Sequence, residues 1–557
     1  MRSKIISCVI CTLMIATILV VEVPKDVSAQ VTEEWIARYD GSGSTDEAYL
    51  LALDSFGNVY IGGSSYGIGT NMDYAVVKYD PAGNQLWNVR FNGEDNGPDS
   101  PIDMVVDLSD NVYITGTIWD DDTYYDWATV KYDSNGNEQW KIIHSSDEFN
   151  KASAMVINSL GNIIVTGNIA TAAYDTEGNI LWTANNELIS NSYVFPNDID
   201  CDDSGNVYIT GSTWDPVSDH DFATIAYSPS GDKLWSATYN GPGNNFDGNC
   251  RIAVDESGNV YITGESVGIF GFTYDYATIK YDYNGNEIWI NRYDDPSHGS
   301  DFPQDIELDS YGNVYVTGTS WNSTTYVDYA TIKYDSAGNE IWVSRYSDIA
   351  ECNDLGIALA IDHSGRVYVT GASESDPHGP YIPEGYYGYV TISYDSLGKE
   401  LWVTRYEGPN EYQDMAMAIA LDEFGNVYVT GSSFGNNGGM DFCTIKYVHH
   451  YDLIRATIDI DPDTLNLKSK GRWITCYITL NEPYNVNDIE IDTILLEDTI
   501  PAEWGDIQGD TLIVKFDRSD VEDMLSPGAY NLKVTGELTD GTLFGGFSDE
   551  IRVIDPP

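Results

Sequence analysis

One unit of roughly fifty residues recurs along most of this chain, and it restricts the fold more than any other feature. The copy at 252–293 reads IAVDESGNVYITGESVGIFGFTYDYATIKYDYNGNEIWINRY. Its four short runs, at 252–254, 260–263, 276–281 and 288–293, are rich in the β-branched and aromatic residues that strands prefer. The turns Asp255–Asn259 and Asp282–Asn286 join the runs in pairs. In each turn the Asp can accept bonds from the turn backbone and the Gly can take a positive φ. One unit therefore predicts a four-stranded antiparallel sheet.

The spacing of the copies predicts how these sheets associate. A Gly ends the second run of every copy, and consecutive glycines are 44 to 60 residues apart. These glycines are Gly63, Gly116, Gly167, Gly211, Gly264, Gly318, Gly371 and Gly431. A small sheet cannot bury both faces alone, whereas a ring of such sheets can. The period suits four strands per unit, so we expect an all-β, eight-bladed β-propeller. A seven-bladed ring with one degenerate copy is the alternative.

The two ends of the repeat array complement each other. The last copy, at 415–447, lacks a fourth run. The N-terminal Trp35–Tyr39 (WIARY) instead matches the fourth runs Trp289–Tyr293 (WINRY) and Trp342–Tyr346 (WVSRY). We therefore expect the N-terminal strand to complete the last blade and close the ring, which removes the open sheet edge.

The repeated motifs are D-x-x-G-N-V-Y-[IV]-T-G and D-Y-A-T-I-K-Y-D-x-x-G-N-E-[IL]-W. From about residue 35 to 447 the chain resembles the bacterial and archaeal β-propeller repeats known as SBBP repeats. This resemblance implies a secreted or cell-surface propeller. It implies no common enzymatic activity, so no catalytic residues are transferred from it.

The segments outside the repeats predict a three-part chain. Residues 1–29 have a basic start, an apolar stretch at 5–21 and small residues at Val27–Ala29, which is typical of a signal peptide; an uncleaved membrane anchor is the alternative. Residues 30–450 form the propeller, and residues 451–557 carry further strand-like runs that we interpret as an Ig-like β-sandwich. A short helix is expected at Ser519–Leu525, with Ser519 as its N-cap. We expect a secreted or cell-surface monomer without a membrane span in the mature chain.

Composition restricts the partners. The formal net charge is −61, which argues against nucleic acid and anionic membranes and leaves cations, extracellular proteins and neutral glycans open. Five cysteines follow the signal peptide, an odd number without a repeat register, so we expect no disulfide framework. Cys443 replaces an Ala of other copies and is interpreted as a small core residue. Each Asp-x-x-Gly-Asn turn supplies a single carboxylate, too few for a calcium site. We expect no cofactor, although calcium remains open.

Candidate site residues are found by comparing the copies with each other. The second, fourth and sixth copies carry acids in the first run: Asp103, Asp198, Asp200, Asp305 and Glu307. The same copies carry Trp119, Trp214 and Trp321 shortly after the marker Gly, and the fifth copy has Arg251 at the matching position of its first run. If the first strands line the channel, these acids, with Arg251 as counter-charge, could hold a cation, a cationic group or a sugar at its mouth. Alternatively, each Trp packs on the Pro of a Pro-x-Asp motif and each Asp bonds loop N–H groups.

The Asp residues that open the third runs are interpreted as bonding neighbouring backbone. They are Asp73, Asp126, Asp221, Asp275, Asp328 and Asp441.

Two functions follow. The first is a non-enzymatic binding or scaffold protein that uses the face with the variable loops, among which Ala372–Gly388 is the longest. The second is a polysaccharide hydrolase or lyase that uses the acids of the channel mouth.

Overall fold

The computed structural model describes residues 30–554 with short gaps. The gaps are 42–43, 123, 146–149, 190–191, 270–272, 349–351, 375–385, 411–412, 423, 437, 451–453, 463, 469–470, 481–483, 498–499, 526, 540–542 and 549–550. The signal peptide predicted at 1–29 and most of the loop 372–388 therefore lie outside the described residues.

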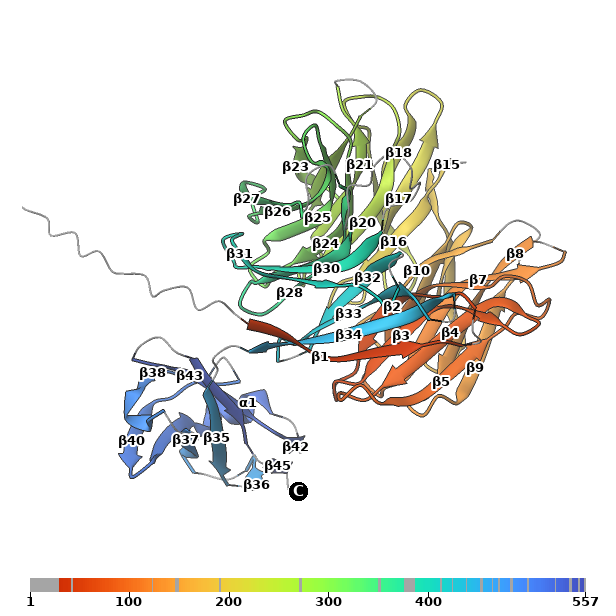
Figure 1. The fold of residues 1–557 in the computed structure, drawn as a ribbon. Coiled ribbons are helices and arrows are strands. Elements are labelled where there is room, and N and C mark those ends of the chain that lie inside the picture. Colours follow the sequence, from red (N-terminus) through yellow and green to blue (C-terminus); the bar gives the residue numbers. More distant parts are fainter. Residues whose placement is uncertain are drawn as a thin grey trace, which may run out of the picture.

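The described residues contain eight four-stranded antiparallel sheets, which we number in chain order (Figure 1). Sheet 1 consists of β2 (Asp46–Leu53), β3 (Val59–Gly67), β4 (Asn71–Tyr79) and β5 (Gln85–Phe91), and sheet 2 of β6 (Ser100–Val106), β7 (Val112–Asp120), β8 (Tyr124–Tyr132) and β9 (Glu138–His144). Sheet 3 consists of β10 (Ala152–Ile157), β11 (Ile163–Gly167), β12 (Ala170–Tyr174) and β13 (Ile180–Asn185). Sheet 4 consists of β16 (Phe195–Cys201), β17 (Val207–Asp215), β18 (Asp219–Tyr227) and β19 (Lys233–Tyr239). A small β14 (Glu187–Ile189) and β15 (Ser192–Tyr193) pair precedes β16.

The other four sheets follow the same plan. Sheet 5 consists of β20 (Asp247–Val254), β21 (Val260–Val267), β22 (Tyr274–Tyr281) and β23 (Glu287–Tyr293). Sheet 6 consists of β24 (Asp301–Leu308), β25 (Val314–Asn322), β26 (Tyr326–Tyr334) and β27 (Glu340–Tyr346). Sheet 7 consists of β28 (Asp354–Ile361), β29 (Val367–Glu374), β30 (Tyr387–Tyr394) and β31 (Glu400–Tyr406). Sheet 8 consists of β32 (Asp414–Leu421), β33 (Val427–Phe434), β34 (Met440–His450) and the N-terminal β1 (Gln30–Tyr39). In Figure 1, β1 in red lies along β34 in blue.

The hairpin turns have the predicted chemistry. Asp255 Oδ1 accepts the backbone N–H groups of Ser257 and Asn259, and Gly258 has a φ of 76°. The other oxygen, Oδ2, accepts the Asn259 amide and the Tyr261 hydroxyl. The first Asp of the motif therefore uses both oxygens inside its own loop, which explains the Asn and the Tyr of D-x-x-G-N-V-Y as well as the Gly.

Neighbouring sheets are joined by a contact between a Trp and a turn. The fourth strand of a sheet carries a Trp whose indole N–H donates to a carbonyl in the last turn of the next sheet, and the glycine of that turn lies against the indole ring. The Trp and carbonyl pairs are Trp35–Pro81, Trp87–Ser134, Trp140–Thr176, Trp182–Pro229, Trp235–Tyr283, Trp289–Ser336 and Trp342–Ser396. The first pair joins β1 of sheet 8 to sheet 1.

The apolar core lies between the sheets and repeats with them. Tyr276 and Tyr293 of sheet 5, for example, pack in one buried cluster with Ile306 and Val316 of sheet 6. Similar clusters join other neighbouring sheets. Tyr39 and Phe442 of sheet 8 share a cluster with Ile61 of sheet 1. Each sheet is therefore apolar on both faces and stable only between its neighbours.

The chain from residue 454 onward forms strands that share no sheet with sheets 1 to 8 within the described residues. Its elements are β35 (Ile454–Asp461), β36 (Thr464–Asn466), β37 (Trp473–Leu480), the 3-10 helix η1 (Val486–Asp488), β38 (Ile489–Leu496), β39 (Ile500–Pro501), β40 (Trp504–Gln508), β41 (Thr511–Asp517), α1 (Arg518–Met524), β42 (Gly528–Tyr530), β43 (Lys533–Leu538), β44 (Leu543–Phe547) and β45 (Ile551–Ile554). They form one sheet in the order β39-β38-β43-β44-β35-β37-β41-β40 and a second in the order β36-β45-β42.

The predicted C-terminal helix exists, but its predicted N-cap is wrong. The helix begins at Arg518, and Asp517 caps it by accepting the N–H of Ser519 at 2.9 Å. The cap lies two residues earlier because Asp517, the last residue of β41, already has extended backbone and a carboxylate oriented toward the first turn. Arg518 then lies inside the helix, where it pairs with Glu522 at 2.6 Å.

Among the described residues, Cys201, Cys250, Cys443 and Cys476 carry free thiols. Cys443 is fully buried among apolar side chains of sheets 7 and 8, as expected of a small core residue.

The contact between a Trp and a turn can be tested at Gly338. This glycine has a φ of 86°, and a Cβ added to it would lie 2.8 Å from Cδ2 of Trp289. We expect Gly338→Ala to lower the free energy of unfolding by roughly 2–4 kcal/mol, because backbone strain and ring overlap add. Gly161→Ala is the matched control: its φ is 77° and nothing lies within 4 Å, so about 1 kcal/mol of backbone strain is expected. Equal losses in denaturant-induced unfolding of the two variants would contradict a packing role for the Trp.

Candidate functional site

Each of the eight sheets has an irregularity in its first strand, opposite the marker glycine of its second strand. In sheet 6 the register shifts between Pro303 and Asp305, where Pro303 pairs with Gly318. Sheets 1 to 5, 7 and 8 show the same shift at the same place. A side chain at Gly318 would collide with the backbone of Phe302 and Pro303. The recurring Gly thus makes room for a β-bulge, a feature that often redirects side chains at functional sites.

The bulge residues of five successive sheets line one cavity of roughly 530 Å³. These residues are Ile102, Ser153, Asn197, Asn249 and Gln304, from sheets 2 to 6. Other wall residues include Lys151, Asn168, Arg251 and Glu265. The wall is therefore rich in amide groups and contains charges of both signs. A second hollow of similar size, near β13 and β19, contains no bulge residue among its lining residues.

Four of the five predicted acids are bonded to backbone of the next sheet. One oxygen of each Asp accepts the N–H of the following residue, and the other accepts an N–H of the first strand of the neighbouring sheet, at 2.7–3.0 Å. The pairs across sheets are Asp103–Met155, Asp198–Ile252, Asp200–Val254 and Asp305–Leu359. These carboxylates connect the inner strands, and the N–H groups they bond belong to strands rather than to loops.

Glu307 differs from the other acids. The residue is exposed to solvent, although many protein groups surround its carboxylate. Loss of hydration and the charges of Asp305, Asp200 and Asp198 raise the pKa of Glu307 to about 8. These Asp residues come from sheets 4 and 6.

The remaining acids of this group are also reluctant to ionise. Loss of hydration raises the pKa of Asp200 to about 7 and those of Asp103 and Asp305 to about 6. It also raises the pKa of Asp198, although the Arg251 guanidinium opposes this shift. The charge of Arg251 also opposes the rise in the pKa of Asp305. The Nη1 of Arg251 donates to the Cys250 carbonyl at 3.2 Å. Arg251 thus lies between acids of sheets 4 and 6.

The three predicted Trp residues lie elsewhere. Each Trp lies near the end of a second strand, past the part of that strand that pairs with the first strand. In sheet 2, for example, the last residue pair between β6 and β7 is Ser100 with Thr117, and Trp119 follows two residues later. Trp119 and Trp321 lie against Gly97 and Gly299 of the loops that precede their own sheets, and Trp214 is exposed. None of the three lines the cavity in the described residues.

The interpretation of the Asp residues that open the third strands is wrong for four of the six. Asp73, Asp275, Asp328 and Asp441 form ion pairs of 2.7–3.0 Å with Arg90, Arg292, Arg345 and Arg38 of the fourth strands. The reason is register: the fourth strand places an Arg beside the third strand in these sheets. Ile143 and Thr238 take that place in sheets 2 and 4.

Sequence comparison missed the bulge residues. Four of them lie five positions before the residue that opens the first turn, and Asn249 lies six positions before Asp255, all beyond the four positions that the copy comparison covered. The Pro-x-Asp motifs could have indicated them, because Pro and Gly within strands often mark a bulge and each of these Pro residues lies opposite a marker Gly. The middle residue of the motif is then the bulge residue.

The raised pKa of Glu307 predicts a pH-dependent stability. The folded state keeps the proton up to about pH 8, whereas an unfolded Glu releases it near pH 4.3. Since the folded state binds more protons between these values, the group lowers stability as the pH rises through this window. We expect Glu307→Gln to raise Tm at pH 9 and to leave Tm nearly unchanged at pH 4. Glu256→Gln, at an exposed turn, is the control and should give the same small difference at both pH values. A Glu307→Gln effect independent of pH would contradict this expectation.

Comparisons with known proteins agree with the repeat architecture. The model of a family described as "SBBP: Beta-propeller repeat" matches residues 34–69, 187–216, 297–323 and 401–439. An uncharacterized WD repeat-containing protein of Acanthamoeba polyphaga mimivirus is 22% identical over 73% of this chain and 36% of its own length. The chain thus spans about a third of the length of that curated relative.

Solved structures similar to this chain have low identity. Sqt1 of Chaetomium thermophilum, bound to the N-terminus of a ribosomal protein, is 9% identical, with 75% of this chain and 100% of that chain covered and a TM-score of 0.49. The β-propeller domain of the Trilobed protease from Pyrococcus furiosus is 12% identical, with coverage of 62% and 93% and a TM-score of 0.37. The polysaccharide lyase Uly1 is 11% identical, with coverage of 72% and 89% and a TM-score of 0.38.

Similarity at this level assigns no ligand or reaction. Among the described residues, no helix has the length and apolar character needed to cross a bilayer. Each segment matched by the family model contains the first two strands of a sheet, the part that carries the marker Gly and the bulge. The chain is a β-propeller repeat protein.

Proposed function

We propose that this chain is a secreted, non-enzymatic binding protein that holds a neutral glycan at the mouth of its propeller. The observation that carries this proposal is the cavity wall formed by bulge residues of five sheets. Asn249 and Gln304 offer amide donors and acceptors, which suit hydroxyl groups, and Ile102 adds apolar surface for a sugar ring. Asn197 adds an amide NH₂ group, since its Oδ1 already accepts the Cys250 N–H at 3.2 Å.

The chemistry of the acids supports a binding role over a reaction. Asp103, Asp198, Asp200 and Asp305 each bond two backbone N–H groups and are absent from the cavity wall. A carboxylate engaged in this way is poorly placed to exchange protons with a substrate. Their bonds keep the inner strands at fixed positions, so the bulge residues are presented on a rigid support.

The proposal includes a specific architecture. Sheets 1 to 8 form an eight-bladed ring closed by β1, supported by the pairing of β1 with β34 and by the Trp35 contact to sheet 1. Residues 1–29 act as a signal peptide, and residues 451–557 form an Ig-like spacer or attachment module. The separate sheets after residue 454 support a distinct module. The net charge of −61 suits an extracellular protein that repels anionic surfaces.

The alternative, a polysaccharide hydrolase or lyase, is favoured by Glu307 alone. A carboxyl with a pKa raised to about 8 keeps its proton at neutral pH and can act as a general acid, and this residue is exposed to solvent. Such a reaction needs a base or nucleophile as partner, and Asp200 with a pKa of about 7 is the neighbouring candidate.

Binding can be tested with a panel of neutral oligosaccharides and calorimetric titration of those retained. We expect Gln304→Ala to weaken binding about tenfold, since roughly 1–1.5 kcal/mol is lost with one hydrogen-bonding side chain. Asn135→Ala removes an exposed amide on a short turn and is the control that should bind as the original chain does. Unchanged affinity in Gln304→Ala, or an equal loss of affinity in Asn135→Ala, would contradict the assignment of this cavity.

The enzymatic alternative needs a separate assay. Polysaccharides are incubated with the protein, and new reducing ends or new unsaturated products are measured. Turnover that Glu307→Gln abolishes while ligand affinity persists would replace the binding function by catalysis. We expect no turnover.

A further inference from the structure

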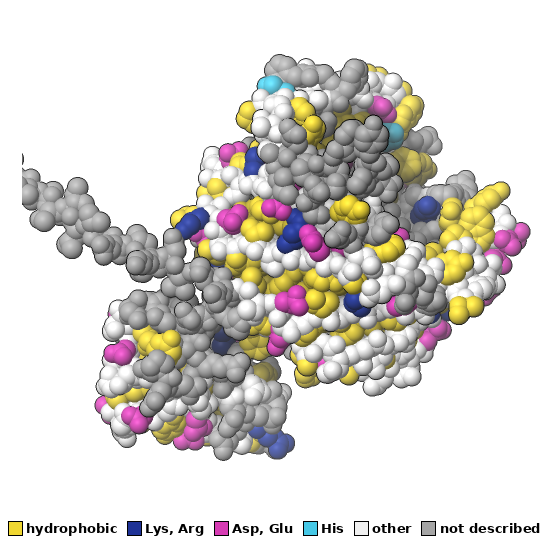
Figure 2. Space-filling model, in the orientation of Figure 1, with side chains coloured by type: hydrophobic (Ala, Val, Ile, Leu, Met, Phe, Trp, Pro, Cys, Tyr) yellow, Lys and Arg dark blue, Asp and Glu magenta, His cyan; other side chains and the backbone are white. Residues whose placement is uncertain are grey.

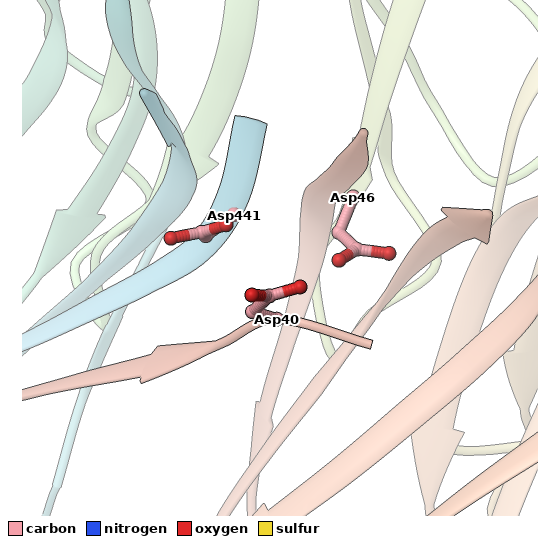
Figure 3. A group of neighbouring side chains, drawn as sticks. All are labelled: Asp40, Asp46 and Asp441. Atoms are coloured by element: carbon pink, nitrogen blue, oxygen red, sulfur yellow. The ribbon is translucent and has the colours of Figure 1, made fainter. Parts of the chain in front are cut away.

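A second set of carboxylates converges between neighbouring sheets, away from the cavity. Between sheets 5 and 6 these are Asp275 of β22, Asp294 directly after β23, and Asp301 at the start of β24; one oxygen of each lies within 4.8 Å of the others. The same structural positions recur between sheets 8 and 1 as Asp441 of β34, Asp40 after β1, and Asp46 at the start of β2. Figure 3 shows the latter three carboxylates near one another, contributed by two strands and the segment that follows β1.

Buried oxygens without a hydrogen-bond partner are the second observation at the interface of sheets 5 and 6. Asp275 is only 6% exposed; its Oδ2 is held by Arg292 at 2.7 Å, whereas its Oδ1 accepts no hydrogen bond. Oδ1 of Asp294 is likewise buried and without a donor. An ionised oxygen buried without a partner is costly, so a positively charged ligand would gain much from contacting it.

Unpartnered oxygens recur at the equivalent positions of other interfaces. Asp73 and Asn92 each have a buried side-chain oxygen without a donor between sheets 1 and 2, and Asp328, Ser347 and Asp354 have one each between sheets 6 and 7. The arrangement is thus a feature of the repeat rather than an accident of one loop. The interfaces that contain Asp294 and Asp40 differ from these two because they have a third carboxylate directly after the fourth strand, where the other two have Asn92 and Ser347.

The charges present do not balance the acids at the interface of sheets 5 and 6. Arg292 pairs with Asp275, and Arg345 is shared between Asp295 and Asp328. His298 Nδ1 lies 2.7 Å from Asp294 Oδ2, on the exposed side. Asp301 is fully buried, and its partners are the hydroxyl of Ser320 and the N–H of Asp295, both neutral. Negative charge therefore remains in excess around the three converging oxygens.

We propose that the interface Asp275–Asp294–Asp301 binds a calcium ion that joins sheets 5 and 6. Calcium takes six to eight oxygen ligands at about 2.3–2.6 Å, so oxygens on opposite sides of one ion lie roughly 5 Å apart, which accommodates this cluster. Carboxylates from two strands and a connecting loop suit its flexible coordination, and water supplies the remaining ligands. Because the ligands come from two sheets, binding strengthens the junction between them.

The test measures calcium binding to the purified protein after chelator treatment, by equilibrium dialysis and by thermal unfolding. We expect one calcium ion per chain at millimolar calcium and a rise in Tm of about 3 °C at a hundred times the dissociation constant. Magnesium at equal ionic strength should give a clearly smaller rise, since it requires a regular octahedron of ligands. No binding at millimolar calcium, or equal shifts with magnesium and with sodium chloride of matched ionic strength, would overturn the proposal.

Variants separate ligation from structure. Asp294→Asn should abolish binding of the ion and the calcium-dependent rise in Tm. Without calcium this variant should unfold no earlier than the original chain, because a repelling charge is removed. Asp203→Asn, at an exposed turn, makes the same charge change and should keep the ion.

An unchanged stoichiometry in Asp294→Asn would overturn the assignment. If this variant fails to fold, the stoichiometry of one and the calcium-specific rise in Tm of the original chain still decide it.

Discussion

The contact between a fourth-strand Trp and the last turn of the next sheet is the interaction on which the architecture depends. It joins an indole N–H to a backbone carbonyl and places a positive-φ glycine under the ring, and seven of these hydrogen bonds connect successive sheets. A sheet of four short strands is unstable alone. A contact of fixed geometry between neighbours therefore controls both their spacing and their orientation, and the buried tyrosines and valines fill the space that results.

The same repeat creates the candidate site through a defect in its first strand. The bulge opposite each marker Gly gives every sheet one side chain that the strand pairing does not use. The strand backbone is held by Asp-to-N–H bonds between sheets 2 and 3, 4 and 5, and 6 and 7, and Asn197 adds a bond by accepting the Cys250 N–H. The proposed recognition residues thus lie beside the stabilising carboxylates on one strand.

Acidic residues serve three different purposes in this chain. Turn carboxylates such as Asp255 bond their own loop, inner-strand carboxylates such as Asp198 bond the next sheet, and interface carboxylates such as Asp275 retain an oxygen without a donor. On the face in Figure 2 the acidic side chains are scattered among neutral ones rather than gathered in one patch. The net charge of −61 thus includes carboxylates with at least three different local roles.

The sequence by itself determined the strands, the turns and the repeat, because these depend on short-range properties: β-branched residues in alternating runs, and Asp and Gly at fixed turn positions. It also matched Trp35–Tyr39 to the fourth strands of the repeat. The roles of Asp198 and Asp305, the Arg partners of Asp73 and Asp275, and the Asp517 cap depended on which backbone groups and side chains lie across a strand or sheet boundary. Only the tertiary structure decided them, since a bulge shifts the register by one residue and thereby changes which side chain faces the channel.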